Sequence, residues 1–257
     1  NTDPAYARLG GLGVAVANPG SEVLPCTPLD ASPEAARAAA LVNAFTRRSR
    51  EIMDRHPVNE RRRAEGKPPG NAILVRDAGD HLPAVPSIVE RFGIEFGCFV
   101  EMPVERGIAR LLGMRVIEVP PSAPDRERGY RLWAARAAEE IRRHGGLYLH
   151  LKGPDEPGHD GDCAAKRDSI ALIDRAFFGE LLPQLDRDEV LIAVTADHAT
   201  PCGLRGHAAD PVPLLIHGPG IRPDATRAFG EREASRGDLG LLRGVEIMPL
   251  LAGLAKG

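Results

Sequence analysis

The sequence predicts an α/β fold in which a mostly parallel sheet is covered by helices on both faces. From about residue 84 onward, helical apolar periodicity alternates with short strand-like runs, which is the pattern of a layered α/β domain. These runs are almost continuously apolar, as expected of strands that are buried on both faces. Pro83 and Pro86 interrupt the chain just before the alternation begins, and they indicate a domain boundary near residue 83.

The part of the chain before this boundary is expected to contain one long helix. Residues 1–28 are rich in glycine and proline and predict loop and short strand. Ser32 followed by Pro33 is typical of a helix start, with a capping side chain before a proline at the first helical position. Apolar residues at a helical period then predict a helix over residues 33–55, and an apolar run predicts a strand over residues 71–76.

The part after the boundary is expected to alternate between helices and strands. Helices are predicted over residues 87–92, 104–112, 126–144 and 164–182. Strands are predicted over residues 95–100, 115–119, 146–151, 189–195 and 213–217. In open α/β sheets the functional loops lie beyond the carboxyl ends of the strands, so the segments after these strands are where a site is expected.

Composition sets limits on the possible partners and compartment. Of the 257 residues, 43% are hydrophobic and 27% charged, which is ordinary for a globular protein. The net charge of −3 gives no reason to expect nucleic acid or an anionic membrane as a partner, and no apolar run reaches the ~20 residues of a membrane span. The cysteines form no CxxC pair, which predicts reduced thiols in a cytoplasmic protein. They are Cys26, Cys98, Cys163 and Cys202.

Carboxylate and imidazole side chains follow the predicted strands in three places. Asp155 and His159 come after the strand that ends near residue 151, and Asp197 and His198 directly follow the next apolar strand. His207 precedes a proline-rich entry into the last strand. Because the carboxyl ends of parallel strands share one edge of a sheet, we expect these five side chains to converge in one pocket.

Aspartate and histidine brought together in this way predict a metal site of a hydrolase or phosphotransferase. Each motif by itself also fits a helix cap or a surface turn, and it is the combination of three strand ends that favours metal. Mixed ligands of this kind suit Mn, Co or Zn better than Mg. Pro154, Pro157 and Gly158 predict a kinked, non-helical loop around the first pair of ligands.

Segments 150–161, 195–202 and 207–216 closely resemble the cofactor-independent (2,3-bisphosphoglycerate-independent) phosphoglycerate mutases of the archaeal-type branch of the alkaline phosphatase superfamily. Weaker matches extend the resemblance over nearly all of the chain. It implies an alkaline phosphatase-like fold with part of an inserted smaller α/β domain. Residues 1–83 would be the C-terminal half of that inserted transferase (cap) domain, and residues 84–257 the metal-binding phosphatase-like domain.

The resemblance also implies a reaction and a division of the ligands. Asp155, His159 and His207 would hold one divalent ion, and Asp197 and His198 would hold a second. Manganese is favoured, with Mg, Co or Zn as alternatives. Together they would serve the glycolytic interconversion of 3-phosphoglycerate and 2-phosphoglycerate through a phosphoserine intermediate.

Part of the family pattern has no counterpart in the sequence. No segment matches the nucleophilic serine, or the N-terminal aspartate that the family adds to the second ion. The chain is therefore expected to be the C-terminal part of the enzyme, with a missing N-terminal segment as its partner and no mutase activity of its own.

Phosphoryl transfer also needs cations around the anionic substrate, and the candidates are Arg76, Lys152 and Arg106. Two alternatives remain open. The chain could belong to a phosphomonoesterase or another phosphotransferase of the same superfamily, because the metal motifs are shared. As presented, it could also be a non-catalytic fragment that binds metal weakly.

Overall fold

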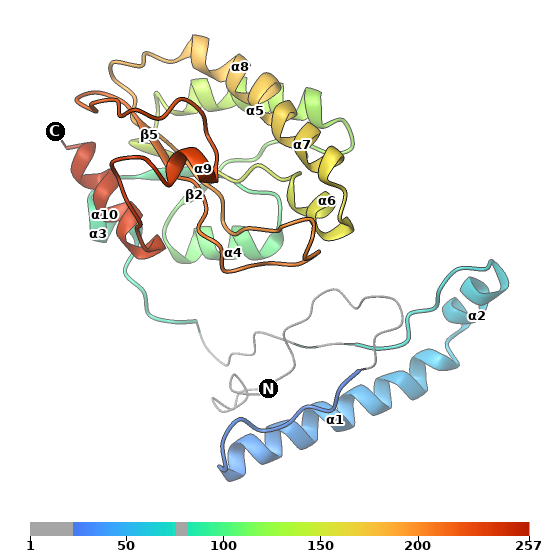
Figure 1. The fold of residues 1–257 in the computed structure, drawn as a ribbon. Coiled ribbons are helices and arrows are strands. Elements are labelled where there is room, and N and C mark those ends of the chain that lie inside the picture. The colour runs from blue at the N-terminus through green and yellow to red at the C-terminus, as the bar shows by residue number, and fades with distance from the viewer. Residues whose placement is uncertain (1–22, 74, 76–81, 257) are drawn as a thin grey trace. The chain divides into compact units, whose positions relative to one another are not determined.

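The computed structural model describes residues 23–73, 75 and 82–256, and the chain divides into two compact units at Ala84 and Val85 (Figure 1). The division falls within two residues of the boundary that the prolines indicated. Among the described helices, none combines the length and the apolar character needed to cross a bilayer.

The first unit is built on α1 (Pro33–Asp54), which is followed by α2 (Pro57–Ala64). As the sequence predicted, Pro33 occupies the first turn of α1, and the hydroxyl of Ser32 accepts a hydrogen bond from the Ala35 amide at 3.2 Å. A strand is predicted over residues 71–76, but the described residues of this range, 71–73 and 75, have irregular structure. Arg76 lies outside the described residues.

The second unit contains a three-stranded parallel sheet in the order β2-β1-β3. In its register, Cys98 of the central strand pairs with Val116 on one side and Tyr148 on the other. The strands are β1 (Phe96–Phe99), β2 (Arg115–Val116) and β3 (Gly146–Leu149). The helices before and between them are α3 (Ile88–Phe92), α4 (Pro103–Leu111) and α5 (Arg126–Glu140). These elements have the predicted type and order, and all of them except α4 are shorter than predicted.

The last two strands lie outside this parallel sheet in the described residues. β4 (Ile192–Val194) and β5 (Leu215–His217) pair with each other in antiparallel fashion, and in the described residues they form a separate two-stranded sheet. A parallel pair needs a crossover, usually a helix, whereas an antiparallel pair needs only a returning loop. The described chain between β4 and β5 contains no helix, and an isolated antiparallel bridge between Ala199 and Ala208 folds it back on itself.

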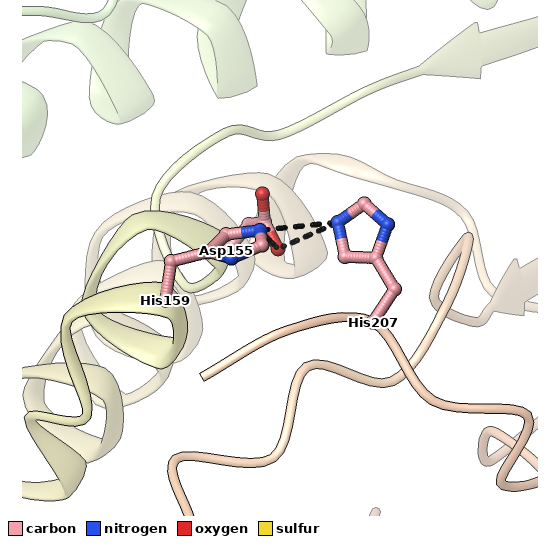
Figure 2. Close-up of side chains that lie close together, drawn as sticks. All are labelled: Asp155, His159 and His207. Carbon is pink, nitrogen blue, oxygen red and sulfur yellow. Dashed lines mark hydrogen bonds and ion pairs between the residues drawn. The ribbon is translucent and has the colours of Figure 1, made fainter. Parts of the chain in front are cut away.

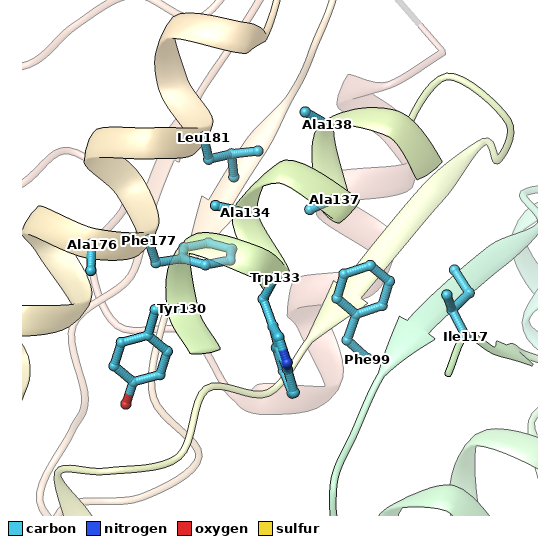
Figure 3. Packing of buried hydrophobic residues seen from close by; sticks show 10 residues of the cluster. All are labelled: Phe99, Ile117, Tyr130, Trp133, Ala134, Ala137, Ala138, Ala176, Phe177 and Leu181. Atoms are coloured by element: carbon cyan, nitrogen blue, oxygen red, sulfur yellow. The ribbon is translucent and has the colours of Figure 1, made fainter. Parts of the chain in front are cut away.

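The core of the second unit surrounds α5, which packs against the sheet through Phe99 and against the long helical segment predicted over residues 164–182 (Figure 3). Trp133 is 1% exposed, donates its indole N–H to the Pro120 carbonyl at 2.8 Å, and meets Phe99 edge to face. The Tyr130 hydroxyl donates to the Lys152 carbonyl and so anchors the chain that leaves β3. Figure 1 shows α5 running alongside the later part of the long helical segment, where its contacts are with η2 and α8. This segment consists of α7 (Cys163–Leu172), a π-helical turn η2 (Ile173–Phe178), α8 (Gly179–Leu181) and a 3-10 turn η3 (Leu182–Gln184).

Two helices follow β5 in the part of the chain for which the sequence predicted no elements. They are α9 (Glu231–Ala234) and α10 (Gly244–Leu254). The Glu246 carboxylate accepts a hydrogen bond from the Arg243 amide at 2.7 Å, which closes the first turn of α10.

Candidate metal centre

Asp155 and His159 lie on a short helix, α6 (Asp155–Asp160), and not on the kinked loop that the sequence predicted. The prediction was wrong because Pro157 stands at the third helical position. A backbone N–H in the first turn has no acceptor within the helix, so a proline there removes no helical hydrogen bond. Gly161 ends the helix in the left-handed conformation with φ 77°. The i, i+4 spacing then places the Asp155 carboxylate and the His159 imidazole on the same face.

His207 reaches this face because the connection between β4 and β5 folds back on itself. The Ala208 amide donates to the Ala199 carbonyl at 3.0 Å, which brings the residues that precede and follow this bridge together. The rings of His198 and His207 consequently lie 3.8 Å apart between centroids. Two imidazoles that are nine positions apart in the sequence thus become neighbours.

Asp155, His159 and His207 form a compact group of three donors (Figure 2). Asp155 Oδ1 lies 3.6 Å from His159 Nε2 and 3.7 Å from His207 Nε2, and the two nitrogens are 3.1 Å apart. Atoms that share one ion at about 2.0–2.2 Å are separated by distances of this size. The group is about half exposed, so solvent or substrate can reach it.

The geometry around His159 indicates which of its nitrogens faces the group. Nδ1 lies 3.3 Å from the Arg205 carbonyl, which can only accept a hydrogen bond, so the proton belongs on Nδ1. Nε2 is then left with a lone pair directed at His207 Nε2 and Asp155. Histidine ligands of metals are oriented by such a bond from their other ring nitrogen. The donor set therefore fits a divalent ion.

Thr200 is a functional residue that the sequence analysis missed. It is 3% exposed, and its hydroxyl donates to Asp155 Oδ1 at 2.6 Å while lying 3.1 Å from His198 Nδ1. Its carbonyl accepts from Lys166 Nζ at 2.6 Å, which ties the loop to α7. Burial raises the pKa of Asp155, but the Thr200 hydroxyl and the neighbouring histidines outweigh burial and hold that pKa below its ordinary value. The sequence offers only a weak signal for this role, a threonine two residues after a histidine.

Asp197 and His198 lie next to the group of three. His198 Nε2 is 3.4 Å from Asp197 Oδ2, and the His198 amide donates to Asp197 Oδ1 at 3.0 Å. Through the stacking of His198 on His207, all five side chains that the sequence singled out form one continuous set. Their division between two ions stays a prediction.

The three predicted substrate-binding cations are in different situations. Lys152 Nζ lies 2.6 Å from Glu105 Oε1 and 3.4 Å from His150 Nε2, and His150 is itself next to Asp197. Arg106 is paired with the Glu118 carboxylate, with Nη1 at 3.1 Å from Oε2. Arg76 is not among the described residues.

Comparison with known proteins places the chain among metalloenzymes. A family model described as "Metalloenzyme superfamily" matches residues 39–253. The 2,3-bisphosphoglycerate-independent phosphoglycerate mutase of Aeropyrum pernix is 43% identical, and the match covers 100% of this chain and 61% of that protein. The mutase of the same name from Thermococcus kodakarensis is 36% identical over 86% of this chain and 54% of that protein. The chain therefore spans between about half and two thirds of the length of these relatives.

Two solved structures are similar in fold. A Pyrococcus horikoshii protein gives a TM-score of 0.72 at 35% identity, covering 87% of this chain and 58% of that one. The cofactor-independent phosphoglycerate mutase of Thermoplasma acidophilum gives a TM-score of 0.51 at 31% identity, covering 92% of this chain and 56% of that one. The predicted α/β class is confirmed.

Proposed function

The chain belongs to the metalloenzyme superfamily, and we propose that the protein containing it is a 2,3-bisphosphoglycerate-independent phosphoglycerate mutase that interconverts 3-phosphoglycerate and 2-phosphoglycerate. The observation that carries the proposal is the group of Asp155, His159 and His207, which α6 and the folded-back loop bring together from positions 48 residues apart. The relatives from Aeropyrum pernix and Thermococcus kodakarensis are 2,3-bisphosphoglycerate-independent phosphoglycerate mutases, and this similarity supports the proposed reaction.

In this proposal the residues of this chain bind the metal ions and orient the substrate. Asp155, His159 and His207 hold one divalent ion, and Asp197 and His198 contribute to the place of a second. When bound, such ions supply the positive charge that stabilises a phosphoryl group during its transfer. A reaction through phosphoserine also needs a serine nucleophile, which we place in the part of the relatives' length that this chain does not span.

Cations near the metal group would orient the phosphate and carboxylate of the substrate. Lys152 is the best placed of the three candidates, because it lies beside His150 at the Asp197 end of the group. Arg106 would first have to break its ion pair with Glu118. Arg76 is proposed as a substrate-binding residue from the sequence alone.

Four finer assignments belong to the same proposal. We propose manganese as the metal, with Mg, Co or Zn as alternatives, because Asp and His ligands together suit it. We propose that the protein acts in glycolysis and in the cytoplasm, which is compatible with four free cysteines in the described chain. Residues 1–83 would be the C-terminal half of an inserted transferase domain, and residues 84–257 the metal-binding domain.

The proposal is tested on the natural full-length protein. It should interconvert the two phosphoglycerates without added 2,3-bisphosphoglycerate, lose the activity in EDTA and regain it with Mn²⁺. Residues 1–257 by themselves should be inactive even with Mn²⁺. Release of phosphate from many esters without mutase activity would contradict the proposal and identify a phosphomonoesterase.

A further inference from the structure

Two cysteines lie close to the metal centre, and neither the ligand assignments nor the proposed reaction uses them. Cys163 is the first residue of α7 and follows shortly after α6, the helix that carries two of the metal ligands. Cys202 lies in the connection between β4 and β5. Cys163 is exposed and Cys202 is half-buried, whereas the other two cysteines of the chain, Cys26 and Cys98, are buried. A reagent in solution therefore reaches the first pair more readily than the second.

Contacts on either side of the pair hold the start of α7 against this connection. Lys166 Nζ donates to the Thr200 carbonyl at 2.6 Å. The Arg205 side chain lies over Gly161, where an added Cβ would be 2.6 Å from Arg205 Nε. In sequence, each of the two cysteines lies between one partner of the first contact and one partner of the second. The two contacts together therefore bring the thiols to the same place.

The two thiols form a hydrogen bond with each other. This bond is the main cause that raises the pKa of the Cys163 thiol, and burial and the charges of Cys202 and Asp162 act in the same direction, against the charge of Lys166. The thiol is therefore the resting form at neutral pH, in agreement with free cysteines in the structure. Because the sulfur atoms already meet, a bond between them needs side-chain rotation and little movement of the backbone.

We propose that Cys163 and Cys202 form a site of reversible oxidation, at which hydrogen peroxide links them into a disulfide. The inference goes beyond the proposed function and does not depend on it. The sulfur of one cysteine attacks a peroxide oxygen and the O–O bond breaks, which gives a sulfenic acid, while the other oxygen leaves as water with the thiol proton. The second sulfur then attacks the sulfenic sulfur, so that the S–S bond forms and a second water leaves. In sum, the two thiols lose two electrons and two protons, and the peroxide is reduced to two waters.

The disulfide would join the two chain segments that supply the metal ligands. Asp155 and His159 lie on the helix that precedes Cys163. His207 lies five residues after Cys202. A bond that closes the chain from residue 163 to residue 202 restricts the unfolded chain and so stabilises the fold. The oxidised protein should therefore hold the two ligand-bearing segments together more firmly than the reduced protein.

The test measures thiols and not turnover, so its outcome is independent of the mutase assay. The natural full-length protein is treated with hydrogen peroxide, digested without reductant and analysed by mass spectrometry. The parent should yield a linked pair of peptides that contain Cys163 and Cys202, lighter by two hydrogen atoms than the separate peptides, and dithiothreitol should release them. Cys26→Ala is the matched control, because Cys26 is a buried cysteine of the first unit, and it should form the same disulfide as the parent.

A single variant separates a disulfide pair from two independent thiols. In Cys163→Ser the sulfenic acid formed on Cys202 has no second thiol to attack it, so dimedone should capture it, whereas the parent should give little adduct. Urea unfolding in EDTA should show a higher midpoint for the oxidised parent than for the reduced parent, and no such shift for Cys163→Ser. If Cys163→Ser fails to fold, Cys202→Ser takes its place in both measurements. A peroxide-treated parent that keeps both thiols free, or shows no shift in its midpoint, would overturn the inference.

Discussion

Thr200 joins the two halves of the metal centre through one buried hydroxyl. The hydroxyl donates to Asp155 on α6 and lies against His198 from the loop after β4. A residue of this kind has no local signature, because its partner Asp155 is 45 positions away in the sequence. The five ligand candidates could be proposed from their place in loops next to predicted strands, whereas the hydrogen bonds that order Asp155 and His198 depend on the tertiary fold.

Replacing Thr200 tests that role. Thr200→Val keeps the shape of the side chain but leaves Asp155 without its donor, so we expect a loss of roughly 1–3 kcal/mol in the free energy of unfolding and weaker Mn²⁺ binding. Thr200→Ser, which keeps the hydroxyl, should bind Mn²⁺ almost as the parent does. Urea unfolding in EDTA and Mn²⁺ titration check the two effects, and a Val variant equal to the parent in both would refute the assignment.

Asp224 gives a pH-dependent prediction at a site remote in sequence from the metal ligands. Hydrogen bonds from the Thr226 hydroxyl, the Thr226 amide and the Asp238 amide outweigh burial and lower the pKa of Asp224 below its ordinary value of 3.8. A carboxyl with a lowered folded-state pKa stabilises the fold above its unfolded-state pKa, and this contribution is lost as the pH falls through the folded-state pKa. Asp224→Asn should therefore destabilise at neutral pH, and the difference from the parent should shrink as the pH falls below about 4.

Urea unfolding of the parent and Asp224→Asn in EDTA, between neutral pH and about pH 3, measures this dependence. EDTA removes the contribution of bound metal. A difference that stays constant over the whole range would show that the carboxylate charge plays no part.

The helix α6 shows how an element can escape sequence analysis. A proline and a glycine within six residues suggest a loop, but a proline in the first turn removes no intrahelical hydrogen bond. By contrast, α1 could be predicted to within one residue because Ser32 and Pro33 are explicit local start signals. Local signals thus predicted the start of α1. They did not predict α6, because a proline fits both a loop and the first turn of a helix.

Close packing of α6 against the loop after β4 leads to a prediction about Gly158. A Cβ at this position would lie 2.7 Å from the Thr200 carbonyl oxygen, so Gly158→Ala should push the loop away and weaken Mn²⁺ binding, together with a loss of roughly 1–3 kcal/mol in stability. Gly203→Ala in the same loop is the control, because a Cβ there meets nothing within 4 Å. Equal Mn²⁺ affinities of the two variants would contradict the packing argument.

The direction of β5 relative to β4 could not be predicted from apolar periodicity. Its apolar run predicted a strand, and a strand is formed, but its pairing with β4 is antiparallel. Apolar periodicity reports burial and not orientation. The clue was the connection of residues 195–214, which offers no helical crossover.

The described chain contains an α/β unit with the candidate metal centre, preceded in sequence by a unit that holds the helices α1 and α2. The order of its parallel strands and their helices could be predicted because alternation and apolar runs are strong signals, and the resemblance to phosphoglycerate mutases extends over nearly the full chain. The relatives are longer, and the chain spans 61% of the one from Aeropyrum pernix. Catalysis is accordingly a property that we assign to the full-length protein, while metal binding at Asp155, His159 and His207 is assigned to this chain.

Anomalous X-ray scattering from crystals grown with Mn²⁺ tests that assignment most directly. The account predicts a strong anomalous peak bonded to Asp155 Oδ1, His159 Nε2 and His207 Nε2, at about the 2.0–2.2 Å at which such donors bind a transition ion. In crystals of Asp155→Asn grown in the same way, the peak should be weakened or lost. A map of the parent with no peak between these three atoms, or with the ion bound by other residues, would contradict the account.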